Sequence, residues 1–288
     1  MKTTIKQIVT NKFFCGATCL TLFAISNRGY AQNSTKKGIE RVPQTFMGNY
    51  IIDNQTVDVN PVKTLEFAIQ HRFGVTNNGY MDMFGLFAGA NIRLSLAYVP
   101  IKNLQVGFGI VAERMQWDGN IKYAITRQAV GKGCPISATY FGDMAISTLP
   151  KNNFASQSDR ISYFNQLMIA RKITERFSVQ VAGSFSYFNT VPSTMKNYQF
   201  TFSAMGSYML TDAFGLVVNY DQPLTQNYTN PYPNLSGGIQ IATASHTFQV
   251  FAGNYQSILQ QSNSMYNQND YKKGNFCIGF NIIKRFYY

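Results

Sequence analysis

The sequence is short of charge. Only 13% of its 288 residues are Asp, Glu, Lys or Arg, whereas a soluble domain usually carries about a quarter. It also lacks any run of about 18 uninterrupted apolar residues beyond its N-terminal stretch, which argues against a helical membrane protein. Yet 45% of the residues are hydrophobic and 15% are aromatic, which excludes a disordered chain. The chain is therefore apolar without containing long apolar segments.

Histidine and cysteine are scarce as well. The two histidines, His71 and His246, fall on distant strands of the pattern described below, and no Cys/His cluster has metal-ligand spacing. Neither histidine has a nucleophile at a position where a catalytic triad would need one. We therefore predict no enzymatic activity, no metal and no cofactor. Cys134 and Cys277 are expected near opposite ends of the fold, which argues against a disulfide between them.

Residues 1–31 are typical of a secretory signal peptide. A basic start precedes a short apolar stretch, Phe13–Ile25, and the small residues Gly29 and Ala31 suit cleavage after Ala31. Cleavage would remove four basic residues and no acid, so the formal charge would fall from +12 to +8. An exported protein seldom meets nucleic acid, and no basic recognition motif is present, so we expect no nucleic-acid partner.

From residue 63 onward, apolar residues recur at every second position within segments of about 8–12 residues. This is the period of a strand with one lipid-facing and one polar face. A soluble sandwich would also alternate, but its outward face should be charged, and here both faces lack charge. We predict an all-β fold, a transmembrane antiparallel up-and-down barrel over residues 63–288. The predicted strands number twelve: 64–73, 91–98, 104–112, 120–127, 136–146, 160–170, 177–188, 198–210, 213–220, 237–243, 246–254 and 275–288.

The connections between these segments alternate between short and long. Short links such as 172–176 alternate with long polar ones such as 74–90 and 147–159, as in a barrel with periplasmic turns and outer loops. We therefore expect a place in the outer membrane, with membrane lipid or lipopolysaccharide around the wall. The aromatic end Phe286–Tyr288 resembles the last strand that the outer-membrane insertion machinery recognises.

Residues 32–62 do not alternate, and they hold Pro43, Pro61 and several Asn and Asp. Two interpretations stay open: a periplasmic segment, or a plug in the mouth of the barrel.

Five charged residues are predicted to line the lumen by their phase along the strands: Glu66, Arg72, Arg93, Lys122 and Asp143. A charge inside a barrel lines water or pairs with its opposite. One interpretation is a structural ion pair between Glu66 and Arg93 on adjacent strands. The other is a constriction in which Arg72, Arg93 and Lys122 attract anions.

Several short motifs resemble a family of predicted outer-membrane β-barrels of unknown function in Bacteroidota. They are Leu65-Glu66-Phe67, His71-Arg72-Phe73-Gly74, Phe84-Gly85-Leu86, Ile92-Arg93-Leu94, Gly107-Phe108-Gly109, Trp117-Asp118-Gly119, Lys122-Tyr123, residues 166–172 and Lys284-Arg285-Phe286. The family has Tyr where this chain has Trp117, and it ends at the Arg-Phe pair, without Tyr287 and Tyr288. The resemblance implies the barrel but no activity. Asp118-Gly119 itself is typical of a tight turn, here opening the fourth strand.

Two functions follow as hypotheses. The first is a passive channel for small solutes, with anions favoured by the basic lumen. The second is a non-conducting structural or scaffold barrel whose loops or N-terminal segment bind envelope or secretion partners.

Overall fold

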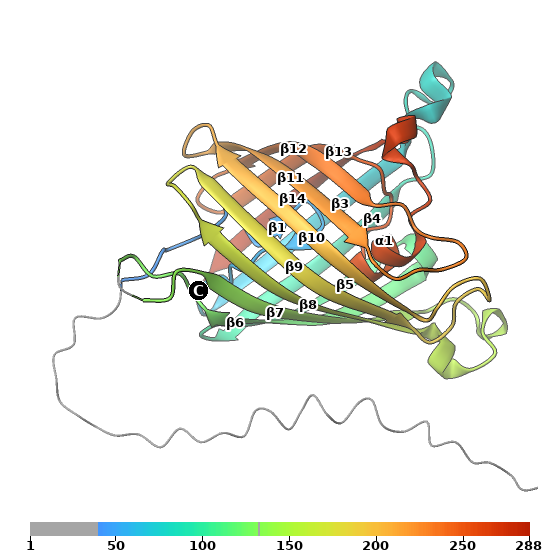
Figure 1. The fold of residues 1–288 in the computed structure, drawn as a ribbon, viewed down its shortest axis with the longest axis horizontal. Coiled ribbons are helices and arrows are strands. Elements are labelled where there is room, and N and C mark those ends of the chain that lie inside the picture. The colour runs from blue at the N-terminus through green and yellow to red at the C-terminus, as the bar shows by residue number, and fades with distance from the viewer. Residues whose placement is uncertain (1–39, 132) are drawn as a thin grey trace, which may run out of the picture. The chain divides into compact units, whose positions relative to one another are not determined.

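The computed structural model describes residues 40–131 and 133–288, and twelve strands of this part form a closed antiparallel barrel (Figure 1). The predicted signal peptide, residues 1–31, lies outside the described residues. The barrel strands are β3 (Thr64–Val75), β4 (Asn91–Ile101), β5 (Leu104–Val111), β6 (Gln116–Thr126), β7 (Ser137–Ser147), β8 (Ile161–Lys172), β9 (Phe177–Phe188), β10 (Tyr198–Met209), β11 (Phe214–Pro223), β12 (Asn234–Ala242), β13 (His246–Gly253) and β14 (Cys277–Tyr287).

Each strand pairs with its neighbours in sequence, and β14 pairs with β3 to close the wall. The predicted all-β, up-and-down barrel of twelve strands is thus confirmed. One local expectation is wrong: Asp118 and Gly119 do not form a turn. They lie inside β6 and pair with Gly109 and Phe108 of β5. The buried Asp118 carboxylate faces the lumen, where it has an arginine partner, and this favours extended backbone over a solvated turn.

The connections define two ends of the barrel. At the turn end lie 102–103, 127–136, 173–176, 210–213 and 243–245. At the loop end lie 76–90, 112–115, 148–160, 189–197, 224–233 and 254–276. The loop end holds the helix α1 (Gln260–Tyr266) and the 3-10 helices η2 (Thr76–Asp82), η3 (Glu113–Met115), η4 (Lys151–Asn153), η5 (Gln157–Arg160) and η6 (Tyr271–Lys273). Cys134 and Cys277 are free thiols at the turn end and the loop end respectively.

The outer face of the wall is apolar. Burial alternates residue by residue along the strands, and the outward set includes Leu96, Phe108, Val181, Phe200, Val218 and Val250. His71 also faces outward, stacked on Phe280 with ring centroids 4.9 Å apart. Such a band suits contact with hydrocarbon. Among the described residues, no helix is long and apolar enough to cross a membrane.

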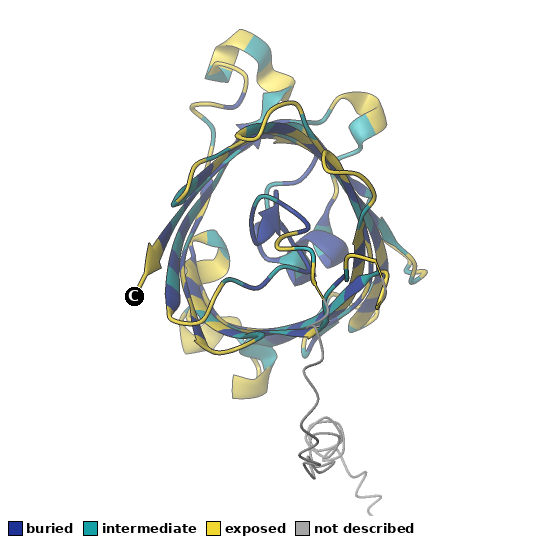
Figure 2. Ribbon diagram, turned by 90° about the vertical axis from the view of Figure 1, so that its left-hand side faces the viewer, coloured by how far each residue is buried: buried dark blue, intermediate teal, exposed yellow. Residues whose placement is uncertain are grey.

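Two segments occupy the lumen. Residues 43–60, called the plug here, contain the short hairpin of β1 (Tyr50–Ile51) and β2 (Asn54–Gln55). The second segment is α1, which the connection from β13 to β14 carries inward. The end-on view shows both as largely buried ribbon inside the ring of strands (Figure 2).

Candidate functional site: the closed lumen

The plug has little regular structure, so its backbone polar groups need other partners. Inward-facing amides and hydroxyls of the wall supply them. Gln180 donates to the carbonyl of Gln55 at 2.7 Å and accepts from the N–H of Val57 at 2.9 Å. Thr139 donates to the carbonyl of Val57 at 2.7 Å, and Ser178 donates to that of Thr45 at 2.6 Å. The neutral polar inner face therefore binds the backbone of the plug.

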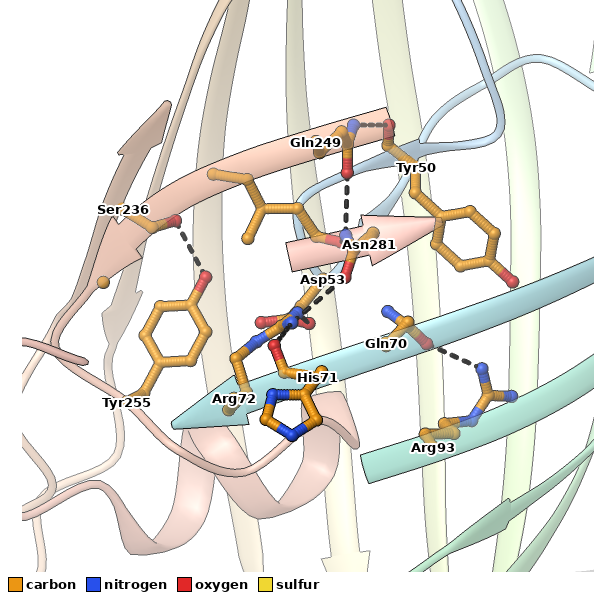
Figure 3. A network of polar contacts seen from close by, with 12 residues as sticks. Tyr50, Asp53, Gln70, His71, Arg72, Arg93, Ser236, Gln249, Tyr255 and Asn281 are labelled. Atoms are coloured by element: carbon orange, nitrogen blue, oxygen red, sulfur yellow. Dashed lines mark hydrogen bonds and ion pairs between the residues drawn. The ribbon is translucent and has the colours of Figure 1, made fainter. Parts of the chain in front are cut away.

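The tip of the plug hairpin is buried and bonded to the wall. Ile52 is fully buried with a φ of 60°, a conformation that a β-branched residue adopts only when its surroundings impose it. Asn281 of β14 donates to the Ile52 carbonyl at 2.8 Å. The same amide donates to Gln249 of β13 at 2.7 Å (Figure 3). Beside Ile52, Asp53 forms an ion pair with Arg72 of β3, whose guanidinium also lies 4.3 Å from the centroid of the Phe251 ring.

Arg93 has its partner in the wall. Its guanidinium donates to both oxygens of Asp118, from Nε at 2.8 Å and from Nη2 at 2.6 Å. Gly109 lies between them on β5, where a Cβ would come within 2.4 Å of Asp118 Oδ1 and 2.7 Å of Arg93 Nη2. The predicted Glu66–Arg93 pair is therefore wrong: a bidentate carboxylate on β6, across a glycine, suits the planar guanidinium better.

Glu66 pairs with Arg285 of β14 instead, at 3.3 Å. It also accepts from Asn49 of the plug at 3.0 Å. Lys122 forms no ion pair within the described residues. Its ammonium donates to the Asn49 carbonyl at 3.5 Å and to Gln55 Oε1 at 3.3 Å. Thus Arg72, Lys122 and Glu66 all contact the plug, and Arg93 interacts with Tyr50 of the plug hairpin.

Asp143, the fifth predicted lumen residue, faces α1. Its Oδ2 accepts from Gln261 at 2.9 Å. Gln260 of the same helix donates to Asn54 of the plug at 2.5 Å, and Asn54 in turn donates to Asp221 of β11 at 2.9 Å. The two inserted segments are thereby joined to each other as well as to the wall.

An apolar cluster also joins the plug to the wall. Phe46, Ile51, Ile52 and Val57 of the plug pack with inward-facing wall residues. The wall contributes Phe141, Phe164, Met168, Ala170, Ala182, Met205, Val217 and Phe251, with Tyr255 from the loop. Burial raises the pKa of Tyr255 well above its ordinary value, so its hydroxyl stays neutral beside Ser236, 2.8 Å away. Large apolar residues at inward-facing strand positions are a sequence signal for a filled lumen, because a water-filled lumen would expose them to water.

Little room is left inside the barrel. Two cavities deep between plug, α1 and wall measure about 10 and 20 Å³, no more than about one water molecule each. Larger cavities open at the turn end. One of about 760 Å³ is lined by Asp58 and Asn60 of the plug and by Lys102, Arg127 and Asp212 of the turns, and one of about 310 Å³ lies between plug residues 44–47 and the ends of the neighbouring strands. Within the described part of the chain, no group of three or more His, Cys, Asp or Glu could hold a metal ion.

A closed wall with an apolar outer band and a polar inner face defines a membrane β-barrel. Within that class, the chain belongs to the family described as "Membrane bound beta barrel domain (DUF5777)", whose model matches residues 46–286. The match begins within the plug, so the inserted hairpin is part of what the family model covers.

Solved porin structures are also similar in outline. The NanC porin is 8% identical with a TM-score of 0.49, covering 76% of this chain and 98% of its own. The KdgM porin is 9% identical with a TM-score of 0.43, covering 78% and 99%. An outer membrane channel from Pseudomonas putida F1 is 11% identical with a TM-score of 0.39, covering 82% and 100%. No curated protein matches this chain.

Proposed function

We propose that this protein is a non-conducting structural barrel of the outer membrane, closed by its own N-terminal segment. The observation that carries the proposal is the filled lumen. Plug and wall share an apolar cluster and a set of buried hydrogen bonds, so the plug is part of the folded core. Of the three cations expected to attract anions, Arg72 and Arg93 are ion-paired and Lys122 is bound to plug oxygens.

The proposed location rests on the membrane-barrel family and the apolar outer band. Export through residues 1–31 and recognition of Phe286–Tyr288 by the insertion machinery belong to the same proposal. Its turn end would then face the periplasm. There the cavity of about 760 Å³, with charges of both signs at its rim, offers a surface to an envelope partner.

Planar-bilayer recording of the purified chain starting at residue 32 tests the closed lumen. We expect no single-channel conductance at moderate voltage. Regular ohmic steps from the intact, folded barrel would contradict the proposal, because they require a continuous water path that the plug and α1 leave no room for.

A second candidate is the passive channel for small solutes, opened when the plug withdraws. It is favoured by the many neutral polar groups of the inner wall, which could face water once the plug backbone has left them. Deleting residues 32–60 tests it. Conductance of a folded deletion variant would support a gated channel, and a folded variant that stays silent would exclude one.

A further inference from the structure

The loop from β3 to β4 carries an unusual concentration of exposed apolar side chains. Six of the eight residues 80–87, called the apolar knob here, are large and apolar: Tyr80, Met81, Met83, Phe84, Leu86 and Phe87. Tyr80, Met81 and Phe87 are 84%, 93% and 80% exposed. Connecting loops are usually polar where they meet water, and a contiguous apolar patch marks a surface that contacts something else.

The backbone holds the knob in one shape. The N–H of Phe84 donates to the carbonyl of Gly79 at 2.7 Å, and that of Gly85 donates to Asp82 Oδ1 at 2.9 Å. Met83 and Phe84 have φ values of 52° and 56°, which are uncommon for residues with a side chain. Gly85 packs so closely on Gly74 that a Cβ there would lie 2.3 Å from the Gly74 carbonyl oxygen. A fixed, strained loop that exposes its apolar side chains points to a function of that surface.

The knob offers no free charge, but its neighbour does. Its one ionisable acid, Asp82, is engaged by Gly85 and by Asn78 at 3.0 Å. The adjoining loop from β13 to β14 carries two exposed cations, Lys272 and Lys273, in η6. The two loops are joined at their bases, since Asn77 donates to Asn275 at 2.9 Å and the N–H of Thr76 to the carbonyl of Phe276 at 2.8 Å.

The loop stands outside the barrel mouth. It is the uppermost feature of Figure 1, and in the end-on view the same feature lies beyond the ring of strands (Figure 2). It therefore overhangs the space next to the apolar outer band of the wall, and it does not cover the lumen. An apolar surface flanked by lysines at that place matches acyl chains beside phosphate groups.

We infer that the apolar knob inserts into the lipid leaflet at the loop end, while Lys272 and Lys273 bind the phosphates of the same lipids. The inference uses the membrane barrel and its wall, and it is independent of whether the lumen conducts. Knob and lysines together form an anchor that fixes the depth and rotation of the barrel in its bilayer.

Single-tryptophan fluorescence tests the insertion. The native tryptophan is removed by Trp117→Phe. A single tryptophan is then introduced as Phe87→Trp or, in a second variant, as Met81→Trp. The matched control is Tyr228→Trp, because Tyr228 is 90% exposed but lies in the loop 224–233, outside the knob. The intact chain is reconstituted in vesicles of phosphatidylcholine with phosphatidylglycerol, with and without brominated acyl chains.

We expect brominated lipid to quench the knob tryptophans several-fold more than the control, and aqueous iodide to quench them several-fold less. Equal iodide quenching at positions 87, 81 and 228 would overturn the inference. So would protection of the knob only after an envelope protein extract is added, because the surface would then belong to a protein partner.

The lysines have a separate readout. In the Phe87→Trp protein, the blue shift of emission should grow with the phosphatidylglycerol fraction, and Lys272→Gln with Lys273→Gln should abolish that dependence. The control pair is Lys151→Gln with Lys196→Gln, on other loops of the same end. If the blue shift of the protein with both lysines does not depend on the phosphatidylglycerol fraction, the lysines have no part in the anchor, because only phosphatidylglycerol offers a phosphate whose negative charge is not balanced by choline.

Discussion

The two sides of the lumen are filled by different chemistry. On the charged side, formed by β14, β3, β4 and β6, three ion pairs and Lys122 lie between wall and plug or within the wall. On the neutral side, formed by β8 to β10, large apolar residues and amides meet the plug. The charged side fixes where the plug lies through the Arg72–Asp53 pair, the one of these three ion pairs that joins the plug to the wall. The neutral side excludes water from the contact between the plug and the wall.

The largest expected effect is on the charged side. Arg72→Ala leaves Asp53 buried at the hairpin tip without its cation, and we expect a loss of about 3–5 kcal/mol in the free energy of unfolding. Urea unfolding in detergent micelles measures it. Arg171→Ala, at an exposed arginine near the end of β8, serves as the control and should change little. A loss for Arg72→Ala as small as that of the control would mean that the plug does not depend on this ion pair.

On the neutral side, Phe164→Ala should cost somewhat less. The ring lies 6.2 Å from that of Phe141, centroid to centroid, within the apolar cluster, and removing a buried ring costs about 3–5 kcal/mol where the cavity cannot collapse. Neighbouring side chains of the cluster, such as Met168 and Met205, can repack into part of the space, so we expect the lower part of that range. Leu167→Ala, the lipid-facing neighbour on the same strand, should cost clearly less. Equal losses would show that the inner cluster is not packed.

Asn49 lies at the contact between the plug and the charged side of the lumen. Its amide donates to Glu66 and, at 3.1 Å, to Gln105. Asn49→Ala removes the donor to Gln105 Oε1 and one of the donors to Glu66 Oε2, which still accepts from Asn60 at 2.9 Å, and we expect a loss of about 1–3 kcal/mol. Limited proteolysis of the reconstituted barrel offers a second measurement, because a loosened plug should be cleaved faster near residues 43–60. Unchanged cleavage and stability would mean that contacts other than those of Asn49 keep the plug in place.

Lys122→Met should give the smallest effect, a change in the free energy of unfolding within about 1 kcal/mol. A buried ammonium without an ion pair stabilises the fold little more than an apolar side chain of similar size. Urea unfolding again measures it. A loss as large as that of Arg72→Ala would mean that the charged side acts as one network and that Lys122 is a full member of it.

If the second candidate function holds, the same comparison predicts which cation sets selectivity. Arg93 keeps Asp118 whether or not the plug is present, whereas Arg72 loses Asp53. In a conducting variant without residues 32–60, Arg72→Gln should reduce anion preference more than Arg93→Gln. Reversal potentials under a salt gradient measure this anion preference. The opposite ranking would show that the Arg93–Asp118 ion pair separates when the plug is absent.

The sequence by itself determined the wall. A period of two with no charge on either face specifies a lipid-facing barrel, and strand number and direction follow from that period and from the alternating connection lengths. Inward phase also predicted that Glu66, Arg72, Arg93, Lys122 and Asp143 would be inside. These properties are local, because each strand carries its own alternation.

Only the tertiary structure decided what the lumen contains. Phase along a strand says which way Arg93 faces, but whether Glu66 or Asp118 meets it depends on strand stagger and on the space above Gly109. The plug has no periodic pattern, since its partners are side chains scattered over most of the wall. Contacts between residues as distant as Ile52 and Asn281 arise only when the ring closes, so alternation alone cannot reveal them.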